Sequence, residues 1–335
     1  MMVTKQEFMV FHKAAAGMLM LAVVLAGSLA GCGSNTQAPQ QVEPVAPILI
    51  PPPQVGQLRW TNDPTLAFSE DGRRLAYVVF EEGDNRQILL WDMAAREAHS
   101  VAGAEGGDTP FFSPDGEWLG FFADGSLKKV LLPGGESITL TPKAPNLRGA
   151  SWGPNGNIVF NLTSTDTLYE VSADGGEPRQ LTTLGEGELS HRWAHVLPGG
   201  HAVLFTIAVS ENPDESLIAV LSLDTGEKKI LVRGGTFARY ATTGHLVYHR
   251  RDAILAVGFD PETLEVRGST LRVTEAVLGS PPDTLTGVAQ FAFSNTGAMS
   301  RVVPTGQTEG DRKVYQIEVW PEWFADLRGA RALGN

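Results

Sequence analysis

Short apolar runs alternate with glycine-containing turns along most of the chain. In "FFSPDGEWLGFF", residues 111–122, two such runs flank a turn that ends at Gly116. Equivalent turns end at Gly72, Gly156, Gly200, Gly244 and Gly297. This pattern predicts β-hairpins, because glycine adopts the positive φ that such turns need. Asp115 is expected to shape its turn rather than to catalyse, since most sister repeats carry Asn, Gly or Thr in its place.

The hairpins repeat with a regular period. The six turn glycines are 44, 40, 44, 44 and 53 residues apart. Several repeats contain a second turn, at Pro133–Glu136, Asp174–Glu177 and Asp224–Glu227. Two hairpins give four strands per repeat, and a four-stranded unit of this length has the size of one propeller blade. The pattern predicts an all-β, six-bladed β-propeller over residues 57–320; a seven-bladed ring is the alternative if the N-terminal segment carries further strands.

The two ends of the repeat region are expected to meet. The last repeat is irregular, with an insertion over residues 279–287 and only about three strand-like runs after Val288. A closed propeller ring avoids long unpaired sheet edges. We therefore expect a strand near Gln57–Trp60 to complete the sixth blade beside Val314–Trp320.

The C-terminal segment, residues 321–335, has a helical period. Trp320, Trp323, Phe324 and Leu327 share the i, i+3, i+4, i+7 spacing of one helix face. A short helix is expected that packs on its own domain, and docking to a partner is the alternative.

The N-terminal segment has the pattern of a secretion signal. Lys5 and Lys13 precede an uncharged apolar run over residues 14–31. The run ends in Leu29-Ala30-Gly31-Cys32, which resembles the bacterial lipobox, where a lipid is attached to the cysteine and the peptide is cut before it. Residues 1–31 are then a signal peptide, with a transmembrane anchor as the alternative because the run has the minimum length of a span.

The segment after Cys32 predicts a tether and a location. Residues 32–56 are rich in Pro and Gln and lack an apolar period, which is typical of an extended, semi-rigid linker. The protein is expected to be lipid-anchored in the bacterial cell envelope and to face the periplasm or the outside. The resemblance to lipoproteins of bacteria with two membranes implies the outer membrane, because Gly33 rather than Asp follows the cysteine.

Composition removes several functional classes. The 335 residues include 37 Gly and 21 Pro, which suits a chain with many turns. The formal charge is −12 and Lys/Arg-rich runs are missing, so nucleic acid is not expected as a partner. Cys32 is the single cysteine, so the chain can form neither an internal disulfide nor a cysteine metal site.

Three stretches carry a family resemblance: "FFSPDGEWLGFFADGSLKKVLLPGGE", "RGASWGPNG" and "SHRWAHVLPGGHAVLF". They resemble the TolB-type, WD-repeat-like propellers of bacteria, including those fused to serine/threonine kinases, over most of residues 60–328. The resemblance implies a propeller that binds partners rather than one that catalyses. The kinase motifs and the Gly-x-Ser-x-Gly elbow of propeller-capped hydrolases are both missing from the sequence.

Two histidine pairs have a spacing that can bind a metal ion on a helix. His191 and His195, like His245 and His249, have the i, i+4 spacing that binds zinc on a helix. The repeat register places both pairs on strands, where residues four apart are about 13 Å from each other. We expect ordinary strand histidines, with neither a metal site nor a cofactor; an ion shared in the central channel is the alternative.

Alignment of the repeats on their turn glycines gives one candidate binding patch. Eight residues before the glycine stand Arg148 and Arg192, at the expected start of the innermost strands. Trp193 and Arg239 lie close by in register. Such a rim could hold an anionic group such as a carboxylate. The alternative is that these arginines pair with local acids such as Asp108.

These observations favour a monomeric, lipid-anchored binding scaffold whose partner is another envelope protein. The alternative is an enzyme or carbohydrate-binding propeller that uses the channel mouth, such as a calcium-dependent lactonase or lyase. Three or more carboxylates and amides from different blades converging on the channel would favour the enzyme, whereas a channel lined by arginine and apolar residues would favour the scaffold.

Overall fold

A computed structural model describes residues 46–145, 148–275, 277–281, 284, 286–310 and 312–329. The predicted signal peptide, Cys32 and residues 32–45 lie outside this range. Within it, none of the helices combines the length and the apolar character that a membrane span requires.

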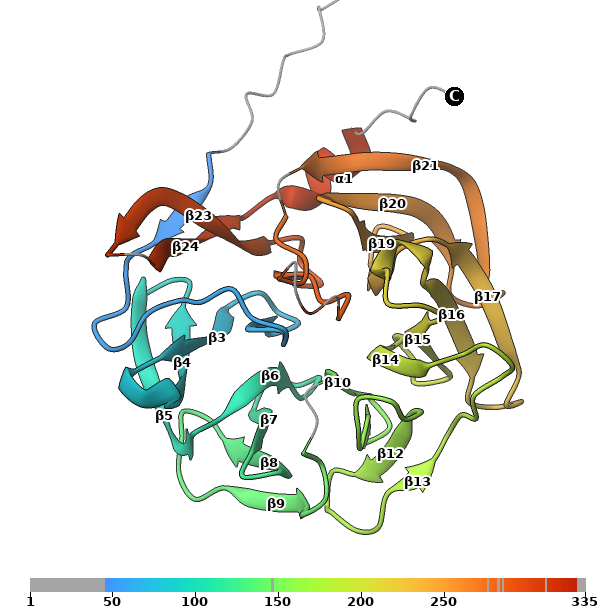
Figure 1. Ribbon diagram of the computed structural model, residues 1–335, viewed down its shortest axis with the longest axis horizontal. Coiled ribbons are helices and arrows are strands. Elements are labelled where there is room, and N and C mark those ends of the chain that lie inside the picture. The colour runs from blue at the N-terminus through green and yellow to red at the C-terminus, as the bar shows by residue number, and fades with distance from the viewer. Residues whose placement is uncertain are drawn as a thin grey trace, which may run out of the picture. The chain divides into compact units, whose positions relative to one another are not determined.

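The described chain is an all-β propeller of six four-stranded sheets, which confirms the predicted blade number (Figure 1). Each sheet is antiparallel, and in five of the six the first strand along the chain lies nearest the ring axis, whereas in the sixth it is the outermost strand. The first three blades, from the axis outwards, are β2 (Leu66–Phe68), β3 (Arg74–Phe80), β4 (Arg86–Asp92) and β5 (Glu97–Glu105); β6 (Asp108–Phe112), β7 (Trp118–Ala123), β8 (Ser126–Leu131) and β9 (Ile138–Thr141); and β10 (Ala150–Trp152), β11 (Asn157–Phe160), β12 (Tyr169–Ser172) and β13 (Arg179–Gln180).

The other three blades follow the same order. They are β14 (Ser190–Val196), β15 (Ala202–Ala208), β16 (Leu217–Ser222) and β17 (Lys228–Arg233); β18 (Thr236–Ala241), β19 (His245–Arg250), β20 (Ala253–Asp260) and β21 (Glu265–Glu275); and β22 (Phe291–Phe293), β23 (Met299–Glu309), β24 (Arg312–Trp320) and β1 (Ile48–Ile50). Two short 3-10 helices, Glu82–Asp84 and Pro213–Glu215, lie in hairpin loops.

The recurring turn is built by side chains as well as by glycine. Gly116 has a φ of 71°, as the hairpin pattern requires. The Asp115 carboxylate accepts hydrogen bonds from the Ser113 hydroxyl (2.5 Å) and from the backbone N–H of Glu117 (2.9 Å). The hydrogen bond from Ser113, and to a smaller extent that from the Glu117 N–H, lowers the pKa of Asp115. Asp115 therefore shapes its turn, as the repeat comparison predicts.

The sixth blade closes with a strand from the N-terminal side, but the strand is not the predicted one. Ile48–Ile50 pairs with Ile317–Val319 of β24. Within Gln57–Trp60, Gln57 forms an isolated bridge to Phe80 and no strand is present. The closing strand lies in the Pro-rich segment that the sequence assigned to the tether, and its three residues are too few to show an apolar period. The strand ends before Pro51, because proline has no backbone N–H to donate to a ladder.

The C-terminal helix α1 (Trp323–Gly329) packs on its own domain rather than presenting its aromatic face to a partner. Trp323, Phe324 and Leu327 are 3%, 5% and 1% exposed. Trp323 stacks on Phe293 of the innermost strand β22 at a centroid distance of 5.6 Å. The helix thus covers the blade that joins the two ends of the propeller.

Candidate functional site in the central channel

Four of the six blades share a backbone irregularity near the start of the innermost strand. Thr109, Trp193 and Phe237 have positive φ values of 52°, 60° and 57°, and Gly149 has 82° at the equivalent position. Strands β6, β14 and β18 each shift register just after this point. The bulge turns Trp193 and Phe237 into the core between blades, where they are 0% and 2% exposed and their ring centroids are 5.6 Å apart.

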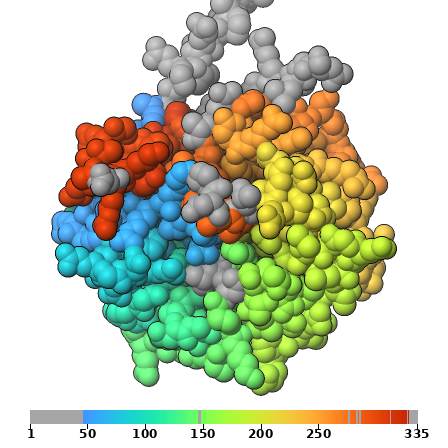
Figure 2. All heavy atoms as spheres, in the orientation of Figure 1, coloured from blue at the N-terminus to red at the C-terminus, as the bar shows by residue number. Residues whose placement is uncertain are grey.

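Two segments close the channel at the end where the innermost strands begin. We call them the plug: residues 57–65, before β2, and the described residues between 277 and 290, before β22. In Figures 1 and 2 they reach the centre of the ring. The Gln290 amide joins them by accepting from the Thr65 hydroxyl (2.8 Å) and donating to the Asp63 carbonyl (2.8 Å). The Trp60 indole donates to the Gly279 carbonyl (2.6 Å).

Arg192 and Trp193 fasten the plug to the propeller. The Arg192 guanidinium and the Trp193 indole both donate to the Thr286 carbonyl, at 2.9 and 3.3 Å. Burial, and secondarily the charge of Arg148, lower the pKa of Arg192 to about 10. Arg192 and Trp193 therefore have a structural role at the plugged end of the channel. Trp193 is fully buried, so it does not line an accessible rim.

Arg148 belongs to a group of charges beneath the plug. Its guanidinium lies 5.8 Å from the Trp193 ring centroid, and its buried Nε has no hydrogen-bond partner in the described part of the chain. Burial and the nearby Asp108 raise the pKa of Asp63 to about 7, against the opposing charges of Arg86 and Arg148. Asp108 is buried and forms its ion pair with Arg86 rather than with a predicted rim arginine. The local acid near Arg148 is Asp63, whose charge acts on the guanidinium.

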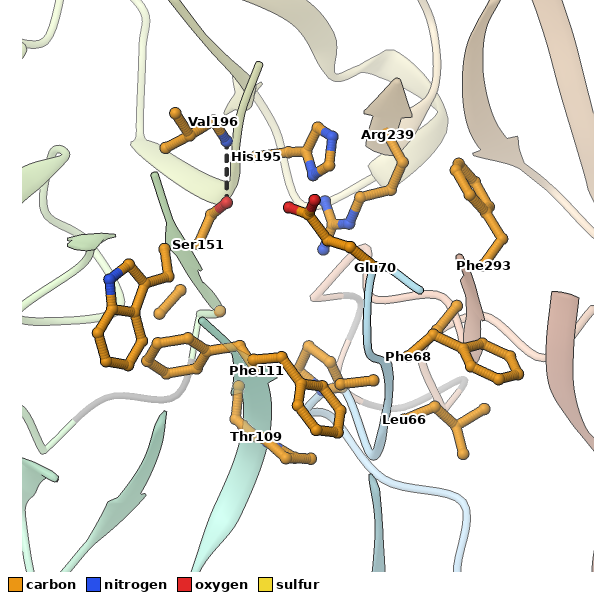
Figure 3. A pocket seen from close by; sticks show the side chains of 18 of the residues that line it. Leu66, Phe68, Glu70, Thr109, Phe111, Ser151, His195, Val196, Arg239 and Phe293 are labelled. Atoms are coloured by element: carbon orange, nitrogen blue, oxygen red, sulfur yellow. Dashed lines mark hydrogen bonds between the residues drawn. The ribbon is translucent and has the colours of Figure 1, made fainter. Parts of the chain in front are cut away.

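Beyond the plug the channel widens into a cavity of about 160 Å³. It is lined by residues from all six innermost strands (Figure 3). In each blade, the residue five positions before the turn glycine lines this cavity. These six residues are Ala67, Phe111, Ser151, His195, Arg239 and Ala292. We call these six residues the channel ring.

The cavity has a mouth at the end where the innermost strands finish. Glu70 and Asn295 lie there, are exposed, and are joined by a hydrogen bond of 2.9 Å from the Asn295 amide to the Glu70 carboxylate. Partial burial raises the pKa of Glu70. Trp152, Tyr240 and Phe293 are partly exposed and line the same cavity. The mouth is therefore largely aromatic, with one carboxylate.

Arg239 carries an unbalanced charge inside the cavity. Its Nη1 donates to the carbonyls of Ala238 (2.9 Å) and Trp193 (3.2 Å), and the guanidinium lies 4.0 Å from the Phe237 ring centroid. No described carboxylate forms an ion pair with it. Burial lowers the pKa of Arg239 to about 9, which leaves it mostly cationic at neutral pH.

His195 lies beside this cation and is neutral. Burial, and then the positive charge of Arg239, lower the pKa of His195 to about 3. His191, on the other side of the register shift, is buried and bonded to Thr182 and Glu188 instead. Both histidine pairs lie on strands, β14 and β19, as predicted. Within the described residues, no three side chains of His, Cys, Asp or Glu come together as a metal site.

The four predicted rim residues thus meet but do not share one surface. Trp193 donates its backbone N–H to the Arg148 carbonyl (2.9 Å) and its carbonyl accepts from Arg239. Arg148 and Arg192 face the plug, whereas Arg239 faces the cavity. Sequence reasoning missed Ser151, and it read His195 only as an ordinary strand histidine. The same repeat alignment, read five residues before the turn glycine instead of eight, finds both.

Comparison with known proteins places the fold. No protein-family model matches the chain. TolB from Acinetobacter baumannii superposes with a TM-score of 0.50 at 19% identity, over 64% of this chain and 55% of TolB. The Cps50 (Swd1) β-propeller domain of Myceliophteria thermophila gives 0.53 at 13% identity, over 79% of this chain and 98% of that domain.

Fold and channel together define a six-bladed β-propeller whose channel is plugged at one end. The TolB-type, WD-repeat-like resemblance in the sequence is confirmed for the fold. Among curated proteins, the Bacillus subtilis protein described as uncharacterized peptidase YuxL is 29% identical over 179 residues. That match covers 48% of this chain, and the chain spans about a quarter of YuxL.

Proposed function

We propose that this chain is a lipid-anchored, extracytoplasmic β-propeller that binds a protein partner in the bacterial cell envelope without catalysing a reaction. The aromatic channel mouth is the observation that carries the proposal. Trp152, Tyr240 and Phe293 are partly exposed around one cavity. Exposed Trp and Tyr beside a pocket are typical of the residues that supply most binding energy at protein interfaces.

The lining of the channel supports a binding role over a calcium-centred active site. A hard cation such as Ca²⁺ takes six to eight oxygen ligands, with several carboxylates among them. In the described chain, the cavity is lined by Glu70 as its one carboxylate, and Arg239 adds a positive charge. Below Glu70 at the mouth, the positive charge of Arg239 disfavours a cation and favours an anionic group.

The anchor is proposed from the sequence. Cys32 would carry the lipid, and cleavage before it would leave residues 32–45 as a spacer ahead of β1. Such a spacer lets a tethered propeller reach neighbouring envelope proteins. Cys32→Ser should abolish incorporation of labelled palmitate and move the chain from the membrane to the soluble fraction. Unchanged labelling and fractionation would refute the anchor.

Site-specific photocrosslinking in intact cells tests partner binding. A photoreactive phenylalanine analogue replaces Trp152 at the mouth in one full-length variant and Val266, which is 38% exposed on the outer strand β21, in the control. The Trp152 variant should crosslink to one envelope protein identified by mass spectrometry, and the control should not. Equal products from both variants, or none from the mouth, would overturn a partner at this site.

An enzyme at the channel mouth is the second candidate function, and the match to YuxL is the observation that favours it. Glu70 and His195 are two titratable side chains in the described lining that could serve as its general acid or base. Peptide hydrolysis by the purified full chain that is lost in both Glu70→Gln and His195→Gln would support this candidate and remove the scaffold proposal.

A further inference from the structure

The channel ring divides into two chemically different halves. Ser151, His195 and Arg239 come from three consecutive blades and form a polar arc. The residues of the remaining three consecutive blades, Ala292, Ala67 and Phe111, form an apolar arc. Figure 3 shows Ser151, His195 and Arg239 along one side of the cavity. A ligand that fills this space must be polar on one side and apolar on the other.

The polar arc has hydrogen-bond donors to spare. The Ser151 oxygen accepts from the backbone N–H of Val196 (2.9 Å), which leaves its hydroxyl proton free to donate. Arg239 uses Nη1 for two carbonyls, and within the described residues its Nε and Nη2 have no partner. The His195 ring likewise has none there, and in its neutral form it offers one N–H. These groups suit an acceptor with two oxygens.

Charge narrows the ligand to a monoanion. Arg239 is the cation of the ring and has no ion pair within the described chain, while the neighbouring His195 is neutral. A guanidinium presents its N–H groups in a planar fork that matches a carboxylate. The opposite arc of Ala292, Ala67 and Phe111 fits an aliphatic body rather than a second charged group.

The dimensions favour the end of a chain. A volume of about 160 Å³ is close to that of a cavity that holds one benzene-sized group, so it admits roughly one apolar residue. The plug closes the far end, so a ligand enters from the mouth and stops. A C-terminal residue has an apolar side chain and a carboxylate together, which the two arcs can contact at once.

We propose that the channel ring binds a carboxylate joined to an apolar body, with the C-terminal residue of a partner polypeptide as its source. This assignment of the ligand rests on the proposed partner-binding function. A free apolar carboxylic acid presents the same chemistry and is separated by experiment. Glu70 lies at the mouth, where its charge opposes entry of an anion.

Calorimetric titration of the purified full chain tests the chemistry with three probes. They are a short peptide that ends in leucine with a free carboxylate, the same peptide with a C-terminal amide, and isocaproate, which carries the leucine side chain on a free acid. The peptide acid should bind at least about tenfold more tightly than the amide, the value of one charge-assisted hydrogen bond. Equal affinity for acid and amide overturns the proposal.

Isocaproate separates the two sources. Weaker binding of isocaproate than of the peptide acid identifies a polypeptide end, because the mouth then adds contacts to the chain that precedes the terminal residue. Binding as tight as that of the peptide overturns the polypeptide source and leaves a site for small acids.

Variants locate the binding. Arg239→Gln should weaken binding of the peptide acid by about tenfold or more, and Arg233→Gln, an exposed arginine on β17, should not change it. Glu70→Gln, at the exposed mouth, should strengthen binding by about two- to fivefold. If Arg239→Gln fails to fold, Ala292→Leu supplies the second test, since it fills the apolar arc and should abolish binding.

Unchanged affinity in a folded Arg239→Gln or Ala292→Leu variant overturns the site. Failure here is distinguishable from failure of the proposed function. If the peptide acid does not bind but the Trp152 photocrosslink to an envelope protein persists, the carboxylate site is wrong and the scaffold stands. If neither occurs, both are wrong.

Discussion

Closure of the ring by Ile48–Ile50 predicts unequal effects for two adjacent residues. Ile50 is 4% exposed and belongs to a buried cluster with Ile317, Val319 and Leu58, whereas Leu49 is 53% exposed on the same strand. Ile50→Ala removes buried methyl and methylene groups and leaves a cavity between the first and last blades. It should lower the free energy of unfolding by about 2–4 kcal/mol. Leu49→Ala keeps the same backbone pairing and should cost less than about 1 kcal/mol.

Urea unfolding of the full chain, followed by tryptophan fluorescence, measures both changes. Because Leu49 and Ile50 share a strand and its hydrogen bonds to β24, their difference isolates the buried contact from strand formation. A similar loss in both variants would show that the strand contributes only its backbone. An Ile50→Ala midpoint equal to that of the unaltered chain would refute closure by this strand.

Three further predictions concern the channel. The pKa of Asp63 is raised to about 7, so between about pH 4 and pH 7 the folded state binds more protons at this group than the unfolded state does. Asp63 therefore makes the stability fall as the pH rises through that window. Asp63→Asn should flatten the slope of the urea midpoint plotted against pH. The His195 ring resonances should not titrate between pH 8 and pH 5 in NMR spectra, and Arg239→Gln should raise the His195 pKa. Gly120→Ala would place a Cβ 2.2 Å from the Phe111 ring and should destabilise the fold by about 1–3 kcal/mol in urea.

The blade architecture could be predicted because each repeat carries its own local signals. A hairpin turn such as Ser113–Gly116 specifies its conformation within a few residues, and the same signals recur six times. The closing strand could not be predicted in this way. Ile48–Ile50 becomes a strand only because β24, far along the chain, offers it a pairing edge, and its proline-rich neighbours resemble a linker.

The plug could not be predicted from the sequence for a similar reason. Its two segments lack periodicity and are held by side-chain bonds between residues more than 200 positions apart, such as Gln290 with Thr65. This pairing decides which end of the channel is closed. It also explains why Arg192, which the repeat alignment placed at a rim, is a structural contact instead: the Thr286 carbonyl covers it.

Differences between repeats are more informative here than their similarities. Each turn has to satisfy only its own hairpin, so its positions tolerate several residue types. Variation at the turn positions therefore gives little information about function. A channel-ring residue faces the ring residues of the five other blades across one small cavity, so the six side chains have to be interpreted as one site. Ser151, His195 and Arg239 are all polar and lie on adjacent blades, while the opposite three positions are Ala, Ala and Phe. Stability alone does not require such a segregated ring, because six apolar residues could fill the space and would leave no uncompensated arginine. The unbalanced charge of Arg239 is therefore the feature of the channel that most directly calls for a ligand.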